Sequence, residues 1–407
     1  MATTDLADWL TLWDNPQTAW LLKRLSANDT LANGAHQVGP YMPKDLLFGL
    51  IPNLDRPSVL NPDVYLQTFI DSHKDSLRIR AVWYNNRLHG RTRNETRLTG
   101  WGGVGSPLLD PESTGALVLF AFVRPANESE LALRIWVCKS VAEEEMVEER
   151  FGQVESGEPL VLQPGVARLS AEGHRARGCR LTRAELPPVW LERFPPGSEL
   201  VMKVCELKPL KGQAPDERLV LRRKCEYELF QSVEEATEAG VIRDGFASIA
   251  DFLQHAHRIL QRRKARSGRS LELQTRQILI EEGLVERVTF EHGAESEPGH
   301  RPDFLFPSAA AYADPAYPVS QLRMLAAKTT CRDRWRQVLN EAKRIRVRHL
   351  LTLQEGVSVA QFAEMREAGV RLVVPRRLLD SYPDVVRPEL LTLARFIEEV
   401  RALRVPG

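Results

Sequence analysis

The sequence lacks the marks of several protein classes. It has only five cysteines in 407 residues, and no two of them form a CxxC pair, which argues against a zinc site. An odd number of scattered cysteines is typical of a reducing cytosol. No run of about 20 apolar residues occurs, so no membrane span is expected. The N-terminus carries acidic residues and no continuous apolar core, which excludes a signal peptide.

The chain also lacks a net charge that would point to one class of partner. Lys and Arg together number 55, and Asp and Glu number 54. Basic residues nevertheless gather in four short stretches: NNRLHGRTRNETR, LVLRRKCE, RILQRRKARSGR and CRDRWRQ. A nucleic-acid-binding protein can be neutral overall when its basic residues cluster. One such stretch alone is equally typical of a solvated helix face.

The length of 407 residues predicts two or three domains, and 43% hydrophobic residues suffice for their cores. Residues 1–172 contain strand-like runs such as GALVLFAFVR, bounded by Gly, Pro and Asn, and one clear helix over 141–151. We therefore expect a mostly β N-terminal domain, built as a barrel or sandwich. The polar, basic segment 173–180 has no apolar period and predicts a linker.

Residues 181–407 predict an α/β domain. Helical periodicity dominates from residue 215 onward. Four strand-like runs follow: PDFLFPS, QLRMLAAK, RHLLTL and VRLVVP. Helices are predicted between them, at about 334–345 and 358–368, and a last helix covers about 387–403. Strands separated by helices are typical of this class.

Acidic residues surround one lysine in this domain. Asp303 opens the predicted strand PDFLF, and Lys328 ends the run MLAAK 25 residues later, so adjacent strands would place them side by side. Glu272 lies on an earlier helix, and Glu341 follows the lysine by thirteen residues on the predicted helix 334–345. Mg²⁺ prefers oxygen ligands such as carboxylates. A lysine beside the metal can orient water and stabilise developing charge in phosphodiester hydrolysis. The pattern alone is loose, because a turn Asp and a strand-end Lys are common.

Longer stretches of the chain resemble the EcoRII family of type II restriction endonucleases. These stretches are KRLSANDT, GAHQVGPYMP, RTRNETR, RPDFLFPSAAAY, KTTCRDRWRQVLNEA and GVRLVVP. The resemblance covers nearly the whole chain in order. It implies an N-terminal β pseudobarrel that binds effector DNA and a C-terminal restriction-endonuclease-like domain of the PD-(D/E)XK kind. It also implies a homodimer, a cytosine methyltransferase as functional partner and a cytoplasmic location.

The activity that the resemblance implies is Mg²⁺-dependent cleavage of both DNA strands at CCWGG, where W is A or T. The cut falls before the first C, which leaves 5′-phosphate ends and five-nucleotide overhangs. Carried over residue by residue, Asp303 and Glu341 would hold the metal, Lys328 would be the catalytic lysine, and Glu272 and Tyr312 would complete the active site.

Two further sets of residues would recognise the DNA site. Arg332, Asp333 and Arg334 fall where the family reads the C·G pairs, and Arg can bond bidentately to guanine while Asp accepts from cytosine. EcoRII itself has a lysine at the position of Arg332, and only arginine donates as a planar fork. Arg223 and Tyr227 lie four apart on one helix face and would sandwich a flipped central base. The alternative is a plain cation–π contact.

Polar loops of the N-terminal domain would bind a second copy of the site. The resemblance assigns this role to His36, Tyr41, Arg91, Arg93, Glu95 and Arg97. Donors and one acceptor together suit base and phosphate contacts. Thr96 stands where the family has a lysine, so one phosphate contact is expected to be missing. The family also implies autoinhibition by this domain until effector DNA binds. Polar hairpin loops without a ligand remain the alternative.

Three functions are compatible with these features. The first is a type II restriction endonuclease. The second is a sequence-specific DNA-binding regulator with an inactive nuclease fold, which the presence of Asp303, Lys328, Glu341 and Glu272 disfavours. The third is a nuclease of another role, which the recognition residues disfavour. The sequence leaves CCNGG and CCSGG open as targets beside CCWGG.

Overall fold

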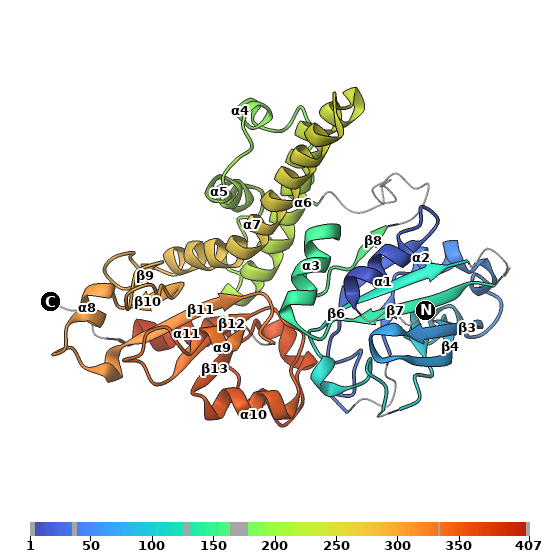
Figure 1. Ribbon diagram of the computed structural model, residues 1–407. Helices are drawn as coiled ribbons and strands as arrows, with labels where there is room; N and C mark the ends of the chain where they lie inside the picture. Colours follow the sequence, from blue (N-terminus) through green and yellow to red (C-terminus); the bar gives the residue numbers. More distant parts are fainter. Residues whose placement is uncertain are drawn as a thin grey trace. The chain divides into compact units, whose positions relative to one another are not determined.

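The computed structural model describes residues 5–34, 39–103, 105–124, 130–152, 154–162, 178–332 and 334–403, and Figure 1 draws the chain. The chain divides into two units. The first is Met1–Ser170 with Gln354–Ala363 and Asp380–Pro388, and the second is Ala171–Leu353 with Glu364–Leu379 and Glu389–Gly407. Local sequence pattern did not predict that two short C-terminal segments belong with the first unit. Most of the predicted linker lies outside the described residues.

The first unit is built on a sheet of short strands. Its described strands are β1 (Ala19–Arg24), β2 (Tyr41–Met42), β3 (Asp63–Ile70), β4 (Asp75–Tyr84), β5 (Glu95–Thr99), β6 (Leu117–Val123), β7 (Ala132–Val137) and β8 (Leu160–Leu162). They form one sheet in the order β2-β5-β4-β3-β7-β6-β1-β8, and of these neighbours only β3 and β7 are parallel. The expected mostly β domain is confirmed as a β half-barrel.

Side chains alternate between the two faces of this sheet along each strand, so that a hydrophobic core forms on each face. On β6, which is buried throughout, Phe120 and Phe122 pack into one core and Leu119 into the other. The helices are α1 (Leu6–Trp13), α2 (Lys44–Leu50) and α3 (Val141–Phe151). Trp9 of α1 and Val147 of α3 belong to the second core, so these two helices cover that face. The predicted helix over 141–151 is confirmed.

Two long helices dominate the start of the second unit. They follow α4 (Pro188–Glu192) and α5 (Gly197–Leu207), and are α6 (Pro215–Asp244) and α7 (Ile249–Glu281). Ion pairs from Arg262 to Glu238 and from Arg263 to Glu234 join α7 to α6. At the start of α6, buried Asp216 accepts hydrogen bonds from the backbone N–H groups of residues 376, 393 and 394 at 2.9–3.1 Å.

The rest of the second unit is a mixed sheet with helices. The strands are β9 (Glu291–His292), β10 (Phe304–Phe306), β11 (Arg323–Lys328), β12 (Arg348–Thr352) and β13 (Val370–Val373). The remaining helices are α8 (Ala309–Ala313), α9 (Trp335–Val338) and α11 (Leu393–Arg401), together with the end of α10 (Val359–Glu367), whose residues up to Ala363 count with the first unit. The described strands follow the order β13-β12-β11-β10-β9, in which β11, β12 and β13 are parallel and β9 and β10 antiparallel to their neighbours. The predicted α/β class and the four predicted strands are confirmed.

The last helix is shorter than predicted. It begins at Leu393 because the Thr392 side chain caps it, accepting from the Arg395 N–H at 3.2 Å. Only a single 3-10 turn, Arg387–Glu389, forms in the predicted span before it. Within the described residues, no helix combines the length and apolar character needed to cross a membrane.

A disulfide joins Cys179 to Cys225 on α6, with their Cα atoms 5.0 Å apart. Because the two residues are 46 positions apart in sequence, spacing gave no sign of the pair. The reduced thiols expected of a cytosolic chain are therefore wrong for these two residues in this structure.

Candidate active site and DNA-binding residues

The predicted pair of Asp303 and Lys328 forms at the ends of neighbouring strands. Asp303 directly precedes β10, and Lys328 is the last residue of β11, which runs antiparallel to β10 with Phe304 opposite Leu325. Asp303 Oδ2 accepts a hydrogen bond from the backbone N–H of Ala327 at 2.6 Å and lies 3.5 Å from Lys328 Nζ. The strand register therefore holds the two side chains together.

Burial raises the pKa of Asp303, although Lys328 and the Ala327 N–H favour the ionised form, and the charge of Glu272 adds to the rise. Glu272, on α7, reaches this site as predicted. Its Oε1 contacts Nε2 of His292 on β9, which lies opposite Phe304 in the sheet. Sequence reasoning did not name His292, because only strand pairing brings it next to these acids.

The structure corrects the position of Glu341. A helix over about 334–345 was predicted, but α9 ends at Val338 and Glu341 lies in the turn beyond it. The helix cannot continue because Ala342 takes a left-handed φ of 48°. Burial raises the pKa of Glu341 to about 7, and Asp303 and Glu297 add to this rise against Lys328 and Arg348.

The acids of this site suit a hard divalent cation. The Oε2 atom of Glu341 is buried and has no hydrogen-bond partner among the described residues. Such an atom is unfavourable unless a donor or cation meets it. Within the same residues, no group of three or more His, Cys, Asp or Glu is arranged to hold a metal. Asp303 and Glu341 therefore offer a partial donor set, which waters and phosphate oxygens would complete around an ion such as Mg²⁺.

The buried Glu341 predicts a pH-dependent stability. Because its folded pKa of about 7 exceeds the ordinary value of 4.5, its stabilising contribution is complete below pH 4.5 and is lost as pH rises to 7. We expect Glu341→Gln to raise the Tm of the metal-free protein at pH 8 by roughly 3 °C, and to have little effect at pH 5. Calorimetry in EDTA measures both values.

The matched control for this prediction is Glu364→Gln, because the Glu364 side chain is 57% exposed. Its Tm should follow that of the wild type at both pH values. A gain from Glu341→Gln that is equal at pH 5 and pH 8 would contradict the idea that ionising Glu341 destabilises the fold.

Tyr312 lies beside a residue that the sequence did not single out. Its hydroxyl donates to Oε1 of Glu297 and accepts from the backbone N–H of Arg344 at 3.2 Å. Burial, together with the Glu297 hydrogen bond, raises the pKa of Tyr312 to about 12, so the phenol stays protonated. The structure thus connects Tyr312 to the turn after Glu341.

The segment after Lys328 passes through the core before it returns toward the surface. Thr330 and Cys331 are buried, whereas Arg332 and Arg334 are half-buried, and Arg334 stands directly before α9. These two arginines follow the proposed catalytic lysine by four and six residues. Asp333 and His36 lie outside the described residues.

The proposed base-flipping residues lie on α6. Arg223 is 5% exposed and Tyr227 is half-buried, one helical turn apart. The guanidinium of Arg266, from α7, lies over the Tyr227 ring at 5.1 Å from its centroid. Tyr227 thus makes a cation–π contact of the kind named in the alternative interpretation, here with Arg266.

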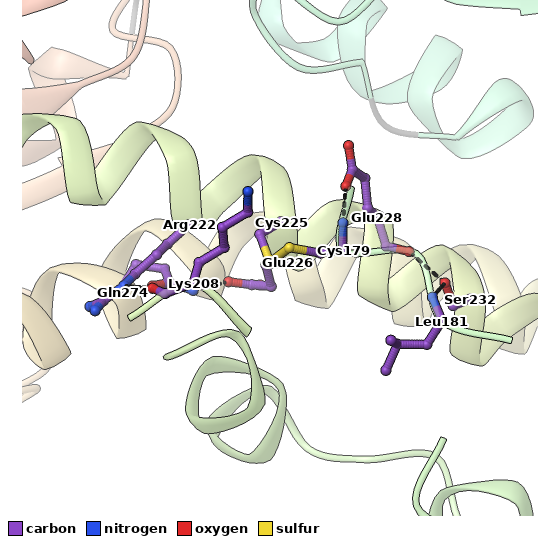
Figure 2. The surroundings of a disulfide bond; sticks show 9 residues. All are labelled: Cys179, Leu181, Lys208, Arg222, Cys225, Glu226, Glu228, Ser232 and Gln274. Atoms are coloured by element: carbon purple, nitrogen blue, oxygen red, sulfur yellow. Dashed lines mark hydrogen bonds between the residues drawn. A yellow bond between two sulfur atoms is a disulfide. The ribbon is translucent and has the colours of Figure 1, made fainter. Parts of the chain in front are cut away.

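The disulfide holds a strip of chain along this part of α6 (Figure 2). The backbone N–H of Cys179 donates to Glu228 at 2.6 Å, and that of Leu181 donates to Ser232 at 3.0 Å. Cys225 itself lies between the two proposed pocket residues in sequence. The disulfide and these two hydrogen bonds therefore hold segment 179–181 against the part of α6 that carries the proposed pocket.

On the first unit, strand pairing gathers several of the predicted effector-binding residues. Tyr41 of β2 stands opposite Arg97 of β5, and the Tyr41 side chain is exposed. Glu95 Oε1 lies 3.6 Å from Arg93 Nε and 3.3 Å from Arg97 Nε. Arg91 is exposed in the loop before β5. The exposed Tyr41 and Arg91 thus share one strand end with the half-buried Arg93, Glu95 and Arg97.

Thr96 belongs to the opposite face of β5. It is fully buried, and its hydroxyl donates to the Met42 carbonyl at 2.6 Å. Because side chains alternate across a strand, Thr96 points away from Glu95 and Arg97. Thr96 itself is therefore not placed to meet a phosphate, and the missing contact at this position stays a prediction.

Comparison with known proteins gives consistent matches to both halves of the chain. The family model "Restriction endonuclease EcoRII, N-terminal" matches residues 14–166, and "EcoRII C terminal" matches residues 230–397. The type II restriction enzyme EcoRII of Escherichia coli is 44% identical over 391 residues, which are 94% of this chain and 94% of that protein.

Two solved structures are also similar. Metal-depleted Ecl18kI in complex with uncleaved, modified DNA is 20% identical and covers 55% of this chain and 84% of its own, with a TM-score of 0.42. The B3 domain of the UbaLAI restriction endonuclease with cognate DNA is 21% identical and covers 35% and 86%, with a TM-score of 0.27. On the sequence identity and the two family models, the chain belongs to the EcoRII family of type II restriction endonucleases.

Proposed function

We propose that this enzyme cleaves both strands of DNA at CCWGG-like sites in an Mg²⁺-dependent reaction. The cut falls before the first C and leaves 5′-phosphate ends with five-nucleotide overhangs. The observation that carries this proposal is the meeting of Asp303 and Lys328 at adjacent strand ends, beside the buried Glu341 Oε2 atom, for which the described residues supply no hydrogen-bond partner. Membership of the EcoRII family sets the expected target.

The residues of the site divide the work. Asp303 and Glu341 would hold Mg²⁺, which supplies charge neutralisation at the phosphate and a more acidic bound water. Lys328 orients the attacking water and stabilises the negative charge that develops on the phosphate. Glu272 completes the acidic group and is held by His292.

Recognition of the DNA rests on two groups of residues. Arg332, Asp333 and Arg334 read the C·G pairs through guanine acceptors and cytosine donors. Arg223 and Tyr227 hold the flipped central base, and a pocket of this kind offsets a few kcal/mol of unstacking. The position of both groups on the second unit supports their assignment to the cleaved site.

Residues 1–172 form the effector domain in this proposal, joined by linker 173–180 to the catalytic domain 181–407. The group of Tyr41, Arg91, Arg93, Glu95 and Arg97, with His36, binds a second DNA site and relieves autoinhibition. The separate location of this group on the first unit supports two DNA sites. A linked two-site mechanism requires that effector DNA bind the active state more tightly.

The working enzyme is proposed to be a homodimer in the cytoplasm. Each chain carries one Asp303–Lys328 pair, and cutting two strands together needs two. Exposed apolar residues on the α6–α7 pair offer a surface for such an assembly, namely Ile242, Ile249, Phe252 and Leu253. A cytosine methyltransferase that modifies the same site would protect the host DNA.

One set of digests tests these proposals. Plasmids with one or two CCWGG sites, and others with CCSGG, are incubated with Mg²⁺ or EDTA, and the ends are mapped by sequencing. We expect cleavage only at CCWGG sites and only with Mg²⁺. The rate should be higher on plasmids with two sites than on plasmids with one. An added CCWGG duplex, or deletion of residues 1–172, should raise the rate on the one-site plasmid. A duplex with 2-aminopurine at W should gain fluorescence on binding.

Each arm has an outcome that contradicts its part of the proposal. Absence of cleavage under every condition, with specific binding retained, would favour the DNA-binding regulator. Cleavage without fixed ends would favour a nuclease of another role. Equal cleavage rates on plasmids with one and two sites would contradict the effector function. Unchanged 2-aminopurine fluorescence on binding would contradict base flipping.

A further inference from the structure

Glu297 binds the turn that follows Glu341. Its Oε2 accepts from the backbone N–H of Ala342 at 3.1 Å, and its Oε1 accepts from that of Lys343 at 2.8 Å. Ser296 Oγ donates to Oε2 at 2.6 Å, and the Tyr312 hydroxyl donates to Oε1. Two donors on each oxygen fill the lone pairs of a carboxylate. Glu297 therefore has little capacity left to act as a metal ligand itself.

The turn needs such a partner because its backbone is unusual. Ala342 is fully buried with a φ of 48°, a conformation that costs about 1–2 kcal/mol for a residue with a side chain. The helix before it has ended, so helical carbonyls do not take up the next N–H groups. On the other side, Arg348 Nε donates to the Glu341 carbonyl at 3.0 Å. The backbone on both sides of the Glu341 side chain is therefore anchored.

Tyr312 and Arg344 extend the same anchor. The Arg344 N–H donates to the Tyr312 hydroxyl at 3.2 Å, and the Arg344 guanidinium donates to the carbonyls of Asp314 and Tyr317 at 2.9 and 3.1 Å. Three successive N–H groups, those of residues 342, 343 and 344, are thus satisfied by Glu297 or by the phenol it holds. Hydrogen bonds therefore join the loop that carries Glu297 to the turn after Glu341.

We propose that Glu297 is a positioning residue, which together with Tyr312 sets the turn so that Glu341 presents its carboxylate to the metal beside Asp303. This inference rests on the proposed active site. Although burial opposes ionisation, hydrogen bonds from Ser296, Tyr312 and the two N–H groups hold the pKa of Glu297 below its ordinary value. The anchor therefore stays an anion over the working pH range.

Glu297→Gln tests the proposal with little change of shape. A glutamine has one acceptor oxygen, so two of the four donors would face its NH₂ group. We expect the cleavage rate to fall about 10- to 100-fold and the half-saturating Mg²⁺ concentration to rise about tenfold. Calorimetric titration of Ca²⁺ into the complex with a CCWGG duplex measures metal affinity without cleavage. The Tm of the metal-free protein reports on folding.

The matched control is Glu295→Gln, the same change two residues away at an exposed acid whose side chain binds the Gly299 N–H at 2.9 Å. It should leave metal affinity at the wild-type value. Tyr312→Phe removes only the hydroxyl group and should shift metal affinity in the same direction by a few-fold. Combining it with Glu297→Gln should add little, because both act through one group.

The outcomes separate this inference from the proposed function. Unchanged metal affinity and rate in Glu297→Gln, or equal losses in Glu295→Gln, would overturn the positioning role while the enzyme stays active. If Glu297→Gln does not fold, Tyr312→Phe decides, and wild-type behaviour there overturns the role. Wild-type protein that neither cleaves nor binds Ca²⁺ would overturn the proposed function and this inference together.

Discussion

Asp303→Asn is expected to lower the rate of DNA cleavage by at least about a thousandfold while leaving DNA affinity within a few-fold. Asparagine keeps the size of the side chain and an oxygen that can accept from Ala327, so β10 and β11 should stay paired. It removes the charge that would hold Mg²⁺ and that faces Lys328 at 3.5 Å. Single-turnover cleavage in Mg²⁺ and gel-shift binding in Ca²⁺ measure the two quantities.

Asp384→Asn serves as the control for this substitution, since the Asp384 side chain is 87% exposed and pairs only with the neighbouring Arg387 among its ion pairs in the described structure. Its cleavage rate should match the wild type. A rate for Asp303→Asn within tenfold of the wild type would show that the catalytic metal lies elsewhere.

Reduction of the disulfide is expected to lower the free energy of unfolding of the second unit by about 2–4 kcal/mol. The bond closes a loop of 46 positions, and cross-links over loops of this length restrict the unfolded chain by about that amount. Calorimetry of the wild type with and without dithiothreitol measures the change. Cys225→Ser should give the reduced value in both conditions.

Cys205→Ser is the matched control, because Cys205 lies outside the disulfide and is half-buried. It should keep the full response to dithiothreitol. A thiol titration of the unfolded chain gives an independent count, with three thiols expected before reduction and five after, since two of the five cysteines are bonded. Five thiols without reductant would contradict the bond. In a reducing cytosol the disulfide would be reduced, and the second unit would have the lower free energy of unfolding.

The sequence predicted the candidate site best where its residues lie at the ends of strands. The runs around Asp303 and Lys328 are apolar and short, so their strand character and their side-by-side position followed from pattern alone. Glu341 was placed on a helix because its neighbours have helical propensity, and the structure ends that helix at Val338. The reason is a carboxylate more than forty residues earlier, Glu297, which takes the N–H groups a longer helix would use.

Other features depended on contacts that local pattern does not encode. The Cys179–Cys225 bond and the Glu272–His292 contact each join segments distant in sequence. Helix α7 runs through Gly268, because one glycine costs only about 1 kcal/mol in a helix. The face on which Thr96 lies became clear only with the register of β2 and β5.

Helix α6 fixes the spacing between two features of the second unit, because it is one continuous helix from Pro215 to Asp244. Its first turn is held by Asp216, which accepts from the backbone N–H groups of the first two residues of α11, and Tyr227 follows eleven residues later along the same helix. At about 1.5 Å per residue this span is about 16 Å, fixed by backbone geometry. One added residue within it would turn the pocket by about 100° around the helix axis. The spacing between the Asp216 anchor and the proposed base pocket is therefore set by helix geometry and not by a loop.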